Sequence, residues 1–169
     1  TFRYITSRNF TAVRTRLHGD YHLGQVLWTG RDFVIIDFEG EPARPISTRR
    51  IKRSPLRDTA GMIRSFHYAV HRGLRGLVDK GLARPENLPD LESWAEHWFL
   101  WTASAFLRSY LRSAPGAAFV PQDRAELDGL LRVYLLEKAV YELGYELDSR
   151  PHWVSLPLRG ILWLVPPQP

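Results

Sequence analysis

The chain contains no cysteine and only one methionine, and it lacks long apolar runs. The absence of cysteine excludes disulfide bonds and thiolate zinc sites and is typical of a reducing compartment, so we expect a cytoplasmic protein. No apolar run approaches the roughly 20 residues of a membrane-spanning helix, so we expect no membrane partner. The 169 residues, 44% hydrophobic and 24% charged, can bury one core, and we expect a single globular domain.

Positive charge is in excess but is concentrated in one place. The formal net charge is +5, and only residues 44–57 are locally very basic. A single basic loop without a recognised reading motif is more typical of a solvated or phosphate-facing loop than of a nucleic-acid interface. We therefore expect no nucleic-acid partner.

Strand signals occur only near the start of the chain. Residues 12–17, 25–28 and 33–38 are predicted strands, and the Gly-containing turn TGRD joins the second to the third as a hairpin. From Ser54 onward the apolar spacing is helical, so we place the boundary between a β-rich start and a helical remainder at this residue.

Three long helices and one short one are predicted after that boundary. Residues 54–81 form the first, with Ser-Pro as a start signal and Gly81 as its end, and residues 90–113 and 122–147 form the next two. The tail is expected to pack one last short helix. The fold class is therefore mainly α, a short hairpin followed by a helical bundle. Aromatic residues on helices are usually core, so we expect burial of Trp94, Trp98 and Trp101.

The stretch RLHGDYHLGQVL, residues 16–27, is dense in polar side chains between apolar flanks. His18 and His22 flank Asp20, and the Asp-x-His spacing resembles that of metallophosphoesterases, which would make this a metal site. Such a site needs further Asp, Asn and His clusters, and the only other close histidine pair lies on a predicted helix. A turn with an Asp cap and core histidines is a second interpretation.

A third interpretation uses the hairpin. If Gln25 begins one strand and Asp37 closes its antiparallel partner, the turn returns the two residues to the same edge, and Asp20 lies in the loop that enters this edge. Carboxylate and amide oxygens suit Mg²⁺ better than zinc. In phosphoryl transfer one carboxylate orients or deprotonates the attacking hydroxyl, while another carboxylate and an amide hold the metal.

At these residues the chain resembles the kinase superfamily, whose catalytic Asp is followed five residues later by Asn and then by a hairpin to a metal-binding Asp. Asp20, Gln25 and Asp37 occupy those places, and HGDYH is the version seen in the aminoglycoside-phosphotransferase-like branch. The resemblance extends over residues 16–164 to bacterial maltokinases, on the segments HGDYHLGQVL, VIIDFEGEPARP, SPLRDTAGMIRSF and LEKAVYELGYEL.

The resemblance implies an ATP-dependent kinase that converts maltose to maltose 1-phosphate. Asp20 would be the catalytic base or hydroxyl-orienting carboxylate, and Gln25 and Asp37 would be the ligands of Mg²⁺. Purely structural roles are the alternatives: helix or turn caps for the two aspartates, and a strand residue without a ligand for Gln25.

Four further residues would support this centre. His18 and His22 would brace the loop. Glu39 stands where the superfamily has Gly, and it would be an anchor close to the metal or a surface carboxylate. Asp58 would accept backbone N–H groups of the catalytic loop from the start of the first helix, or would be an ordinary first-turn carboxylate.

A sugar acceptor needs aromatic faces and polar groups, and the third long helix offers both. Tyr134, Lys138, Tyr141 and Tyr145 follow one another at spacings of four, three and four, so they share a face. The alternative is a polar-aromatic helix that packs against its neighbours. Further candidates for the sugar site are Glu137, Glu142, Arg150 and Trp153. The segment GYELDSRP departs at two positions from the family's pattern, which leaves the details of acceptor recognition open.

A kinase also needs an N-terminal lobe, and residues 1–15 are too few to form one. We therefore expect this chain to be a single C-terminal lobe, with the catalytic loop, hairpin and metal segment in residues 1–53 and a helical subdomain in residues 54–169. The resemblance implies a longer maltokinase or the kinase half of a trehalose synthase fusion, and a fragment that is nearly inactive alone. Two alternatives stay open: a kinase for an aminoglycoside, choline or another sugar, and a non-catalytic binding module.

Overall fold

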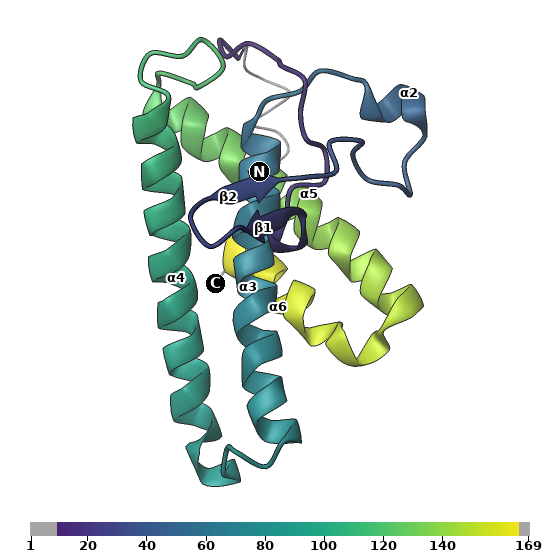
Figure 1. Cartoon of the computed structure of the whole chain (residues 1–169), viewed down its shortest axis with the longest axis vertical. Helices are drawn as coiled ribbons and strands as arrows, with labels where there is room; N and C mark the ends of the chain where they lie inside the picture. Colours follow the sequence, from purple (N-terminus) through teal and green to yellow (C-terminus); the bar gives the residue numbers. More distant parts are fainter. Residues whose placement is uncertain (1–9, 166–169) are drawn as a thin grey trace.

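The computed structural model describes residues 10–165, which are mainly α-helical (Figure 1). The hairpin follows a 3-10 turn, and its elements are η1 (Leu23–Gln25), β1 (Val26–Trp28) and β2 (Phe33–Ile35). The helices are α2 (Ile46–Arg49), α3 (Leu56–Asp79), α4 (Leu88–Ser113), α5 (Arg124–Ser149) and α6 (Ser155–Leu164), with the 3-10 turns η2 (Pro85–Asn87) and η3 (Pro151–Trp153). The predicted fold class, a hairpin followed by a helical bundle, is confirmed.

The hairpin forms where the sequence predicts it, but with shorter strands. β1 and β2 pair antiparallel, with Val26 opposite Ile35 and Trp28 opposite Phe33. β2 stops at Ile35 because Asp37 has a φ of +61°, a left-handed conformation that cannot continue a strand. The strand predicted over residues 12–17 is wrong: within it only Thr15 forms a bridge, to Arg53, since no neighbouring strand is there to extend the pairing.

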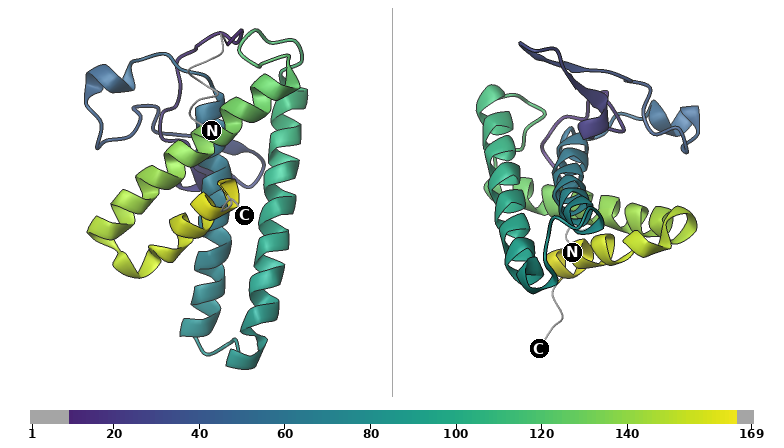
Figure 2. Two further views of the ribbon diagram at one scale, coloured as in Figure 1. Left: turned by 180° about the vertical axis from the view of Figure 1, so that it is seen from behind. Right: turned by 60° about the horizontal axis from the view of Figure 1, so that its bottom comes forward.

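α3 is the central helix of the bundle. It packs against α4 and α5, and α5 packs against α6, with α5 crossing α3 on the side away from the hairpin (Figures 1 and 2). The core cluster joins Ala60 and Ile63 of α3 to Phe99 of α4 and Leu135 of α5. Near its start α3 lies directly beneath the loop before the hairpin, because a Cβ on Gly61 would lie 2.8 Å from the backbone oxygen of Tyr21.

The expectation that the tryptophans of α4 are core residues is wrong. The exposed fractions of Trp94, Trp98 and Trp101 are 72%, 48% and 79%. The buried residues of α4 are Ala95 and Phe99, which lie roughly 100° around the helix from the tryptophan stripe. Helical spacing therefore predicted the helix correctly but did not show which of its two apolar stripes faces the core.

No helix within residues 10–165 is both long enough and apolar enough to cross a membrane.

Candidate active site

Asp58 fixes the loop that carries Asp20. In the first turn of α3, its carboxylate accepts hydrogen bonds from the backbone N–H groups of His18, at 2.8 Å, and Gly19, at 3.0 Å. Gly19 has a φ of +88°, a conformation that glycine adopts without strain. Burial raises the pKa of Asp58, and the two backbone hydrogen bonds oppose this effect. The contact is the one that the kinase resemblance implies for this residue.

His18 connects the loop to the segment after the hairpin. It is 7% exposed, and its Nε2–H donates to the backbone oxygen of Ile36 at 2.8 Å. Nδ1 is then the acceptor, and it lies 3.4 Å from the backbone nitrogen of Asp20. Since both ring nitrogens have protein partners, the contacts of His18 are those of a brace.

His22 also contacts its own loop. Its Nδ1 accepts from the backbone N–H of Gly24 at 3.0 Å, and its Nε2 lies 3.5 Å from Oδ2 of Asp20. Within residues 10–165 no three His, Cys, Asp or Glu side chains are grouped as they would be around a metal ion. The histidine metal centre considered from the sequence therefore lacks a set of ligands in this part of the chain.

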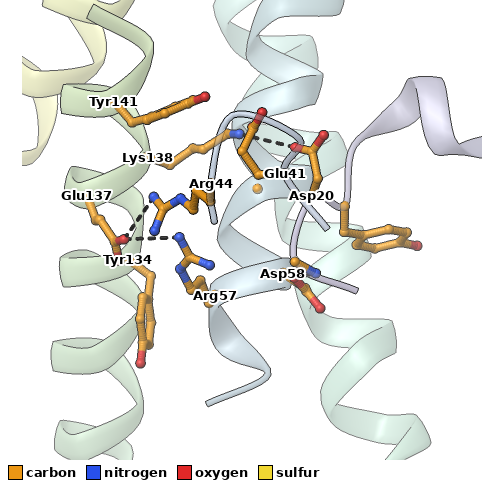
Figure 3. Close-up of a pocket in the computed structure, with 12 residues that line it drawn as sticks. Asp20, Glu41, Arg44, Arg57, Asp58, Tyr134, Glu137, Lys138 and Tyr141 are labelled. Carbon is orange, nitrogen blue, oxygen red and sulfur yellow. Dashed lines mark hydrogen bonds and ion pairs between the residues drawn. The ribbon is translucent and has the colours of Figure 1, made fainter. Parts of the chain in front are cut away.

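Asp20 lies between two nitrogen-bearing side chains. Besides His22, Nζ of Lys138 on α5 lies 3.7 Å from its Oδ1, and the Asp20 side chain is 15% exposed (Figure 3). The hydrogen bond with His22 holds the pKa of Asp20 below its ordinary value, against the opposing effect of burial, and the charge of Lys138 acts in the same direction as His22. Asp20 is therefore ionised at neutral pH.

Gln25 and Asp37 meet at the open edge of the hairpin, as predicted. Gln25 Nε2 donates to Oδ2 of Asp37 at 2.9 Å. The positive φ of Asp37 directs its exposed carboxylate at this edge and is tolerated better by Asp than by most residues. Glu39 is exposed, and its side chain makes no hydrogen bond or ion pair with any residue between 10 and 165; only its backbone oxygen accepts, from Arg49.

A large open cavity of about 760 Å³ extends from Asp20 along α3 and α5. Six of the residues predicted for the sugar site line it: Lys138, Tyr141, Glu142, Tyr145, Arg150 and Trp153. Sequence reasoning missed other lining residues, among them Glu41, Ser65, Tyr68, Arg72 and Glu146. The Tyr68 and Trp153 rings are stacked at 6.4 Å, which gives the far end of the cavity an aromatic wall.

The other two predicted sugar residues, Tyr134 and Glu137, lie instead at a small adjoining cavity of about 30 Å³ beneath the loop (Figure 3). Oε1 of Glu137 lies 3.1 Å from Arg57 and 3.6 Å from Arg44, so its charge is shared between two arginines. Tyr134 is half-buried, and burial raises its pKa. Glu137 thereby ties the segment after Asp37 to the first turn of α3.

Two carboxylates of the large cavity are also paired. Glu142 forms a buried ion pair with Arg64 of α3, with Nη2 at 2.7 Å and Nε at 2.9 Å. Burial raises the pKa of Glu142, although Arg64 opposes the shift. Arg150 donates from two nitrogens to Glu146, at 2.7 and 3.0 Å. The first pair connects α3 to α5, and the second lies at the C-terminal end of α5, just before η3.

The fold and the placement of this loop, hairpin and bundle define a mainly helical, kinase-like C-terminal lobe. The chain is 26% identical over 89% of its length to a glucosamine kinase from Streptacidiphilus jiangxiensis, and 30% identical over 83% of its length to one from Mycolicibacterium smegmatis. It spans about a third of these relatives, 31% and 32% of their lengths. No protein-family model matches the chain.

Comparison with solved structures also finds glucosamine kinases. A glucosamine kinase in one crystal form superposes with a TM-score of 0.64, covering 89% of this chain and 33% of that one, at 26% identity. A glucosamine kinase in complex with glucosamine, ADP and inorganic phosphate superposes with a TM-score of 0.59, over 88% of this chain and 34% of that one, also at 26% identity. The chain is thus similar to sugar kinases. The names of these relatives and structures refer to glucosamine and not to maltose.

Proposed function

We propose that this chain is the catalytic C-terminal lobe of an ATP-dependent sugar kinase. The observation that carries the proposal is the position of Asp20, an ionised carboxylate at one end of a cavity lined by aromatic and charged side chains. The similarity to glucosamine kinases over most of the chain supports the same reaction class.

In the proposed reaction, Asp20 accepts a hydrogen bond from one hydroxyl of the sugar and aims its oxygen at the γ-phosphorus of ATP. The new oxygen–phosphorus bond forms as the bond to the β-phosphate oxygen breaks, and the hydroxyl proton passes to Asp20. The hydrogen bond with His22, and to a smaller extent the charge of Lys138, favours the ionised form of Asp20 before this step. Asp58 and His18 hold the loop so that the carboxylate is oriented before the substrate arrives.

Gln25 and Asp37 fit a hard cation because an amide oxygen and a carboxylate are ligands that Mg²⁺ prefers, and these two side chains meet at the open edge of the hairpin. Bound there, Mg²⁺ would neutralise charge on the phosphates of ATP. Glu39 lies two residues beyond Asp37, its side chain forms no hydrogen bond or ion pair with residues 10–165, and it would support the metal through water.

The proposal also concerns which sugar accepts the phosphate. An amino sugar is favoured because the relatives are glucosamine kinases. Maltose, which the sequence resemblance implies, is the second candidate, supported by the size of the cavity and by the aromatic residues Tyr68, Tyr141, Tyr145 and Trp153 on its walls. Nothing in the names of the relatives supports a trehalose synthase fusion.

A phosphorylation screen of the full-length protein that contains these residues tests the proposal, with ATP and a panel of glucosamine, glucose, maltose, choline and an aminoglycoside. We expect turnover of a sugar, and a fall in kcat on the order of 10³-fold for Asp20→Asn and for Asp37→Asn. Asp79→Asn, at an exposed position at the end of α3, is the matched control. Unchanged turnover in both site variants would instead support a non-catalytic binding module.

A further inference from the structure

The large cavity is lined by four carboxylates, and three of them have a cationic partner. Asp20 faces Lys138, Glu142 is paired with Arg64, and Glu146 is paired with Arg150. The fourth, Glu41, forms no ion pair with any residue in the described range 10–165. Its carboxylate oxygen Oε1 only accepts a long, 3.5 Å hydrogen bond from the backbone N–H of Ala43, and the Tyr141 hydroxyl is its other partner.

Glu41 lies at the Asp20 end of the cavity. Of the residues that line the large cavity, only a few also line the small one beneath the loop: Asp20, Glu41, Gly61, Lys138 and Tyr141. Figure 3 shows the Glu41 side chain directed toward the same space as Asp20 and the tip of Lys138. A sugar whose hydroxyl is oriented by Asp20 would therefore place a neighbouring substituent beside Glu41.

The cations near Glu41 are directed at other groups. Nζ of Lys138, whose tip faces the same space, lies 3.7 Å from Oδ1 of Asp20. Arg44 and Arg57 both point to Oε1 of Glu137, and the Arg44 guanidinium lies over the Tyr141 ring, 5.6 Å from its centre. Arg72 lines only the large cavity, not the part that Asp20 and Glu41 share, and it is exposed. Within residues 10–165 no cation forms an ion pair with Glu41, so a ligand with an ammonium group would supply the positive charge that this part of the cavity lacks.

We propose that Glu41 is the specificity-determining residue of the acceptor site, and that it binds the protonated amine of an amino sugar. This inference rests on the proposed kinase function and adds the group that selects the acceptor. A neutral sugar would displace water from the half-buried Glu41 carboxylate but would bring no positive charge to pair with it. The site would therefore bind a neutral sugar less tightly than an amino sugar. Discrimination by a missing partner of this kind is usually stronger than discrimination by size.

The test compares glucosamine with glucose in the full-length protein and its Glu41→Gln variant. We expect kcat/KM for glucosamine to fall about 10- to 100-fold in the variant, the usual effect of losing a charge-assisted hydrogen bond, while the value for glucose changes less than about threefold. Glu41→Asp should recover part of the preference. Glu86→Gln, at an exposed carboxylate in η2, serves as the control that should leave both values unchanged.

Calorimetric titration of glucosamine and glucose into the same proteins without ATP separates this inference from the proposed function. Glu41-dependent binding of glucosamine in a protein that phosphorylates neither sugar would support the inference and reject the kinase function. A wild-type kinase without a preference for glucosamine over glucose, or a Glu41→Gln variant that keeps the full preference, would overturn the inference and leave the kinase function in place. A protein that neither binds nor phosphorylates glucosamine would overturn both.

Discussion

At the scale of single residues, the ion pair between Asp20 and Lys138 joins two distant parts of the chain. Asp20 comes from the loop before the hairpin and Lys138 from the middle of α5, and their charged atoms lie 3.7 Å apart. Lys138 also lies over the Tyr141 ring, 5.2 Å from its centre, which limits the directions its ammonium can take. The pair therefore connects the loop before the hairpin to the α5 side of the large cavity.

Replacing Lys138 with Met should change the pH dependence of the reaction. The other groups facing Asp20 are His18 and His22 of its own loop and Tyr141 of α5. His22 would still lower the pKa of Asp20, but loss of the ammonium should raise this pKa relative to the wild type. Because the proposed reaction needs Asp20 in its ionised form, the acid limb of kcat/KM should move to higher pH.

The measurement is kcat/KM of the full-length protein against pH, with Lys80→Met, an exposed lysine just after α3, as the matched control. A Lys138→Met variant whose activity falls by the same factor at every pH would contradict the electrostatic role and leave only a contribution to packing or binding.

At the scale of the elements, α3 buries a histidine that should make the fold sensitive to acid. His67 is 8% exposed, and its Nδ1 accepts a hydrogen bond from Nη1 of Arg64 at 3.1 Å. Burial, and then the charge of Arg64, lowers the pKa of His67 to about 3. The ring is therefore neutral in the fold over the whole range in which an unfolded histidine takes up a proton.

Because the folded pKa lies below the unfolded value of about 6.5, the unfolded chain binds more protons between these limits. The free energy of unfolding should therefore be highest above pH 6.5 and should fall toward pH 3, by at most ~1.4 kcal/mol per pH unit from this residue. His67→Gln should reduce that slope. Burial also lowers the pKa of His71, which contributes to the slope in the same direction. Part of the slope should therefore remain in the His67→Gln variant.

Urea unfolding of the 169-residue chain at several pH values measures the slope. His97→Gln, at an exposed histidine of α4, is the control. An equal slope in the wild type and in His67→Gln would show that protonation of His67 does not limit stability in acid.

The sequence predicts these elements well because their signals are local. The first long helix was expected over residues 54–81 and is observed as Leu56–Asp79, since Ser-Pro and Gly81, with its φ of +66°, mark its ends. The hairpin was predictable for the same reason. Burial depends on distant partners, so the tryptophans of α4 and the strand over residues 12–17 could not be predicted correctly.

In the candidate site, too, the features set by local sequence were predictable and those that depend on distant residues were not. Asp20, Gln25 and Asp37 were predictable as a group because a short loop and a hairpin connect them. The stripe on α5 was predictable as a face, but the ion pairs that occupy Glu137 and Glu142 depend on Arg44, Arg57 and Arg64, which come from other elements. Glu41 lies within the segment VIIDFEGEPARP but was not predicted as a site residue, and only the structure shows that its carboxylate forms no ion pair with residues 10–165.

At the scale of the whole molecule, the residues that the structure describes leave the hairpin largely exposed. Within residues 10–165 it is the only sheet, and its larger apolar side chains are exposed: Leu27, Trp28, Phe33, Val34 and Ile35. An exposed apolar patch of this kind is typical of a surface that meets another part of a protein. The chain also spans only about a third of the curated relatives it matches, so the proposed enzyme would draw further residues from outside this region.

The 169-residue chain, prepared alone, should therefore fold but should phosphorylate sugars at less than about 1% of the rate of the full-length protein, because positioning of ATP accounts for most of the catalysis in phosphoryl transfer. The hairpin supplies Gln25 and Asp37 at one edge of such a site, but the described residues place no second layer opposite them. The residues that line the large cavity come from the loop and η1, from Glu41 in the segment after the hairpin, and from α3, α5 and residues 150–153, all within the described range, so sugar binding should be much better retained than turnover. Calorimetry with the sugar and a coupled ADP assay measure the two properties on the same sample. A rate within tenfold of the full-length protein would mean that this lobe holds ATP without further residues, and that the apolar hairpin has some other partner.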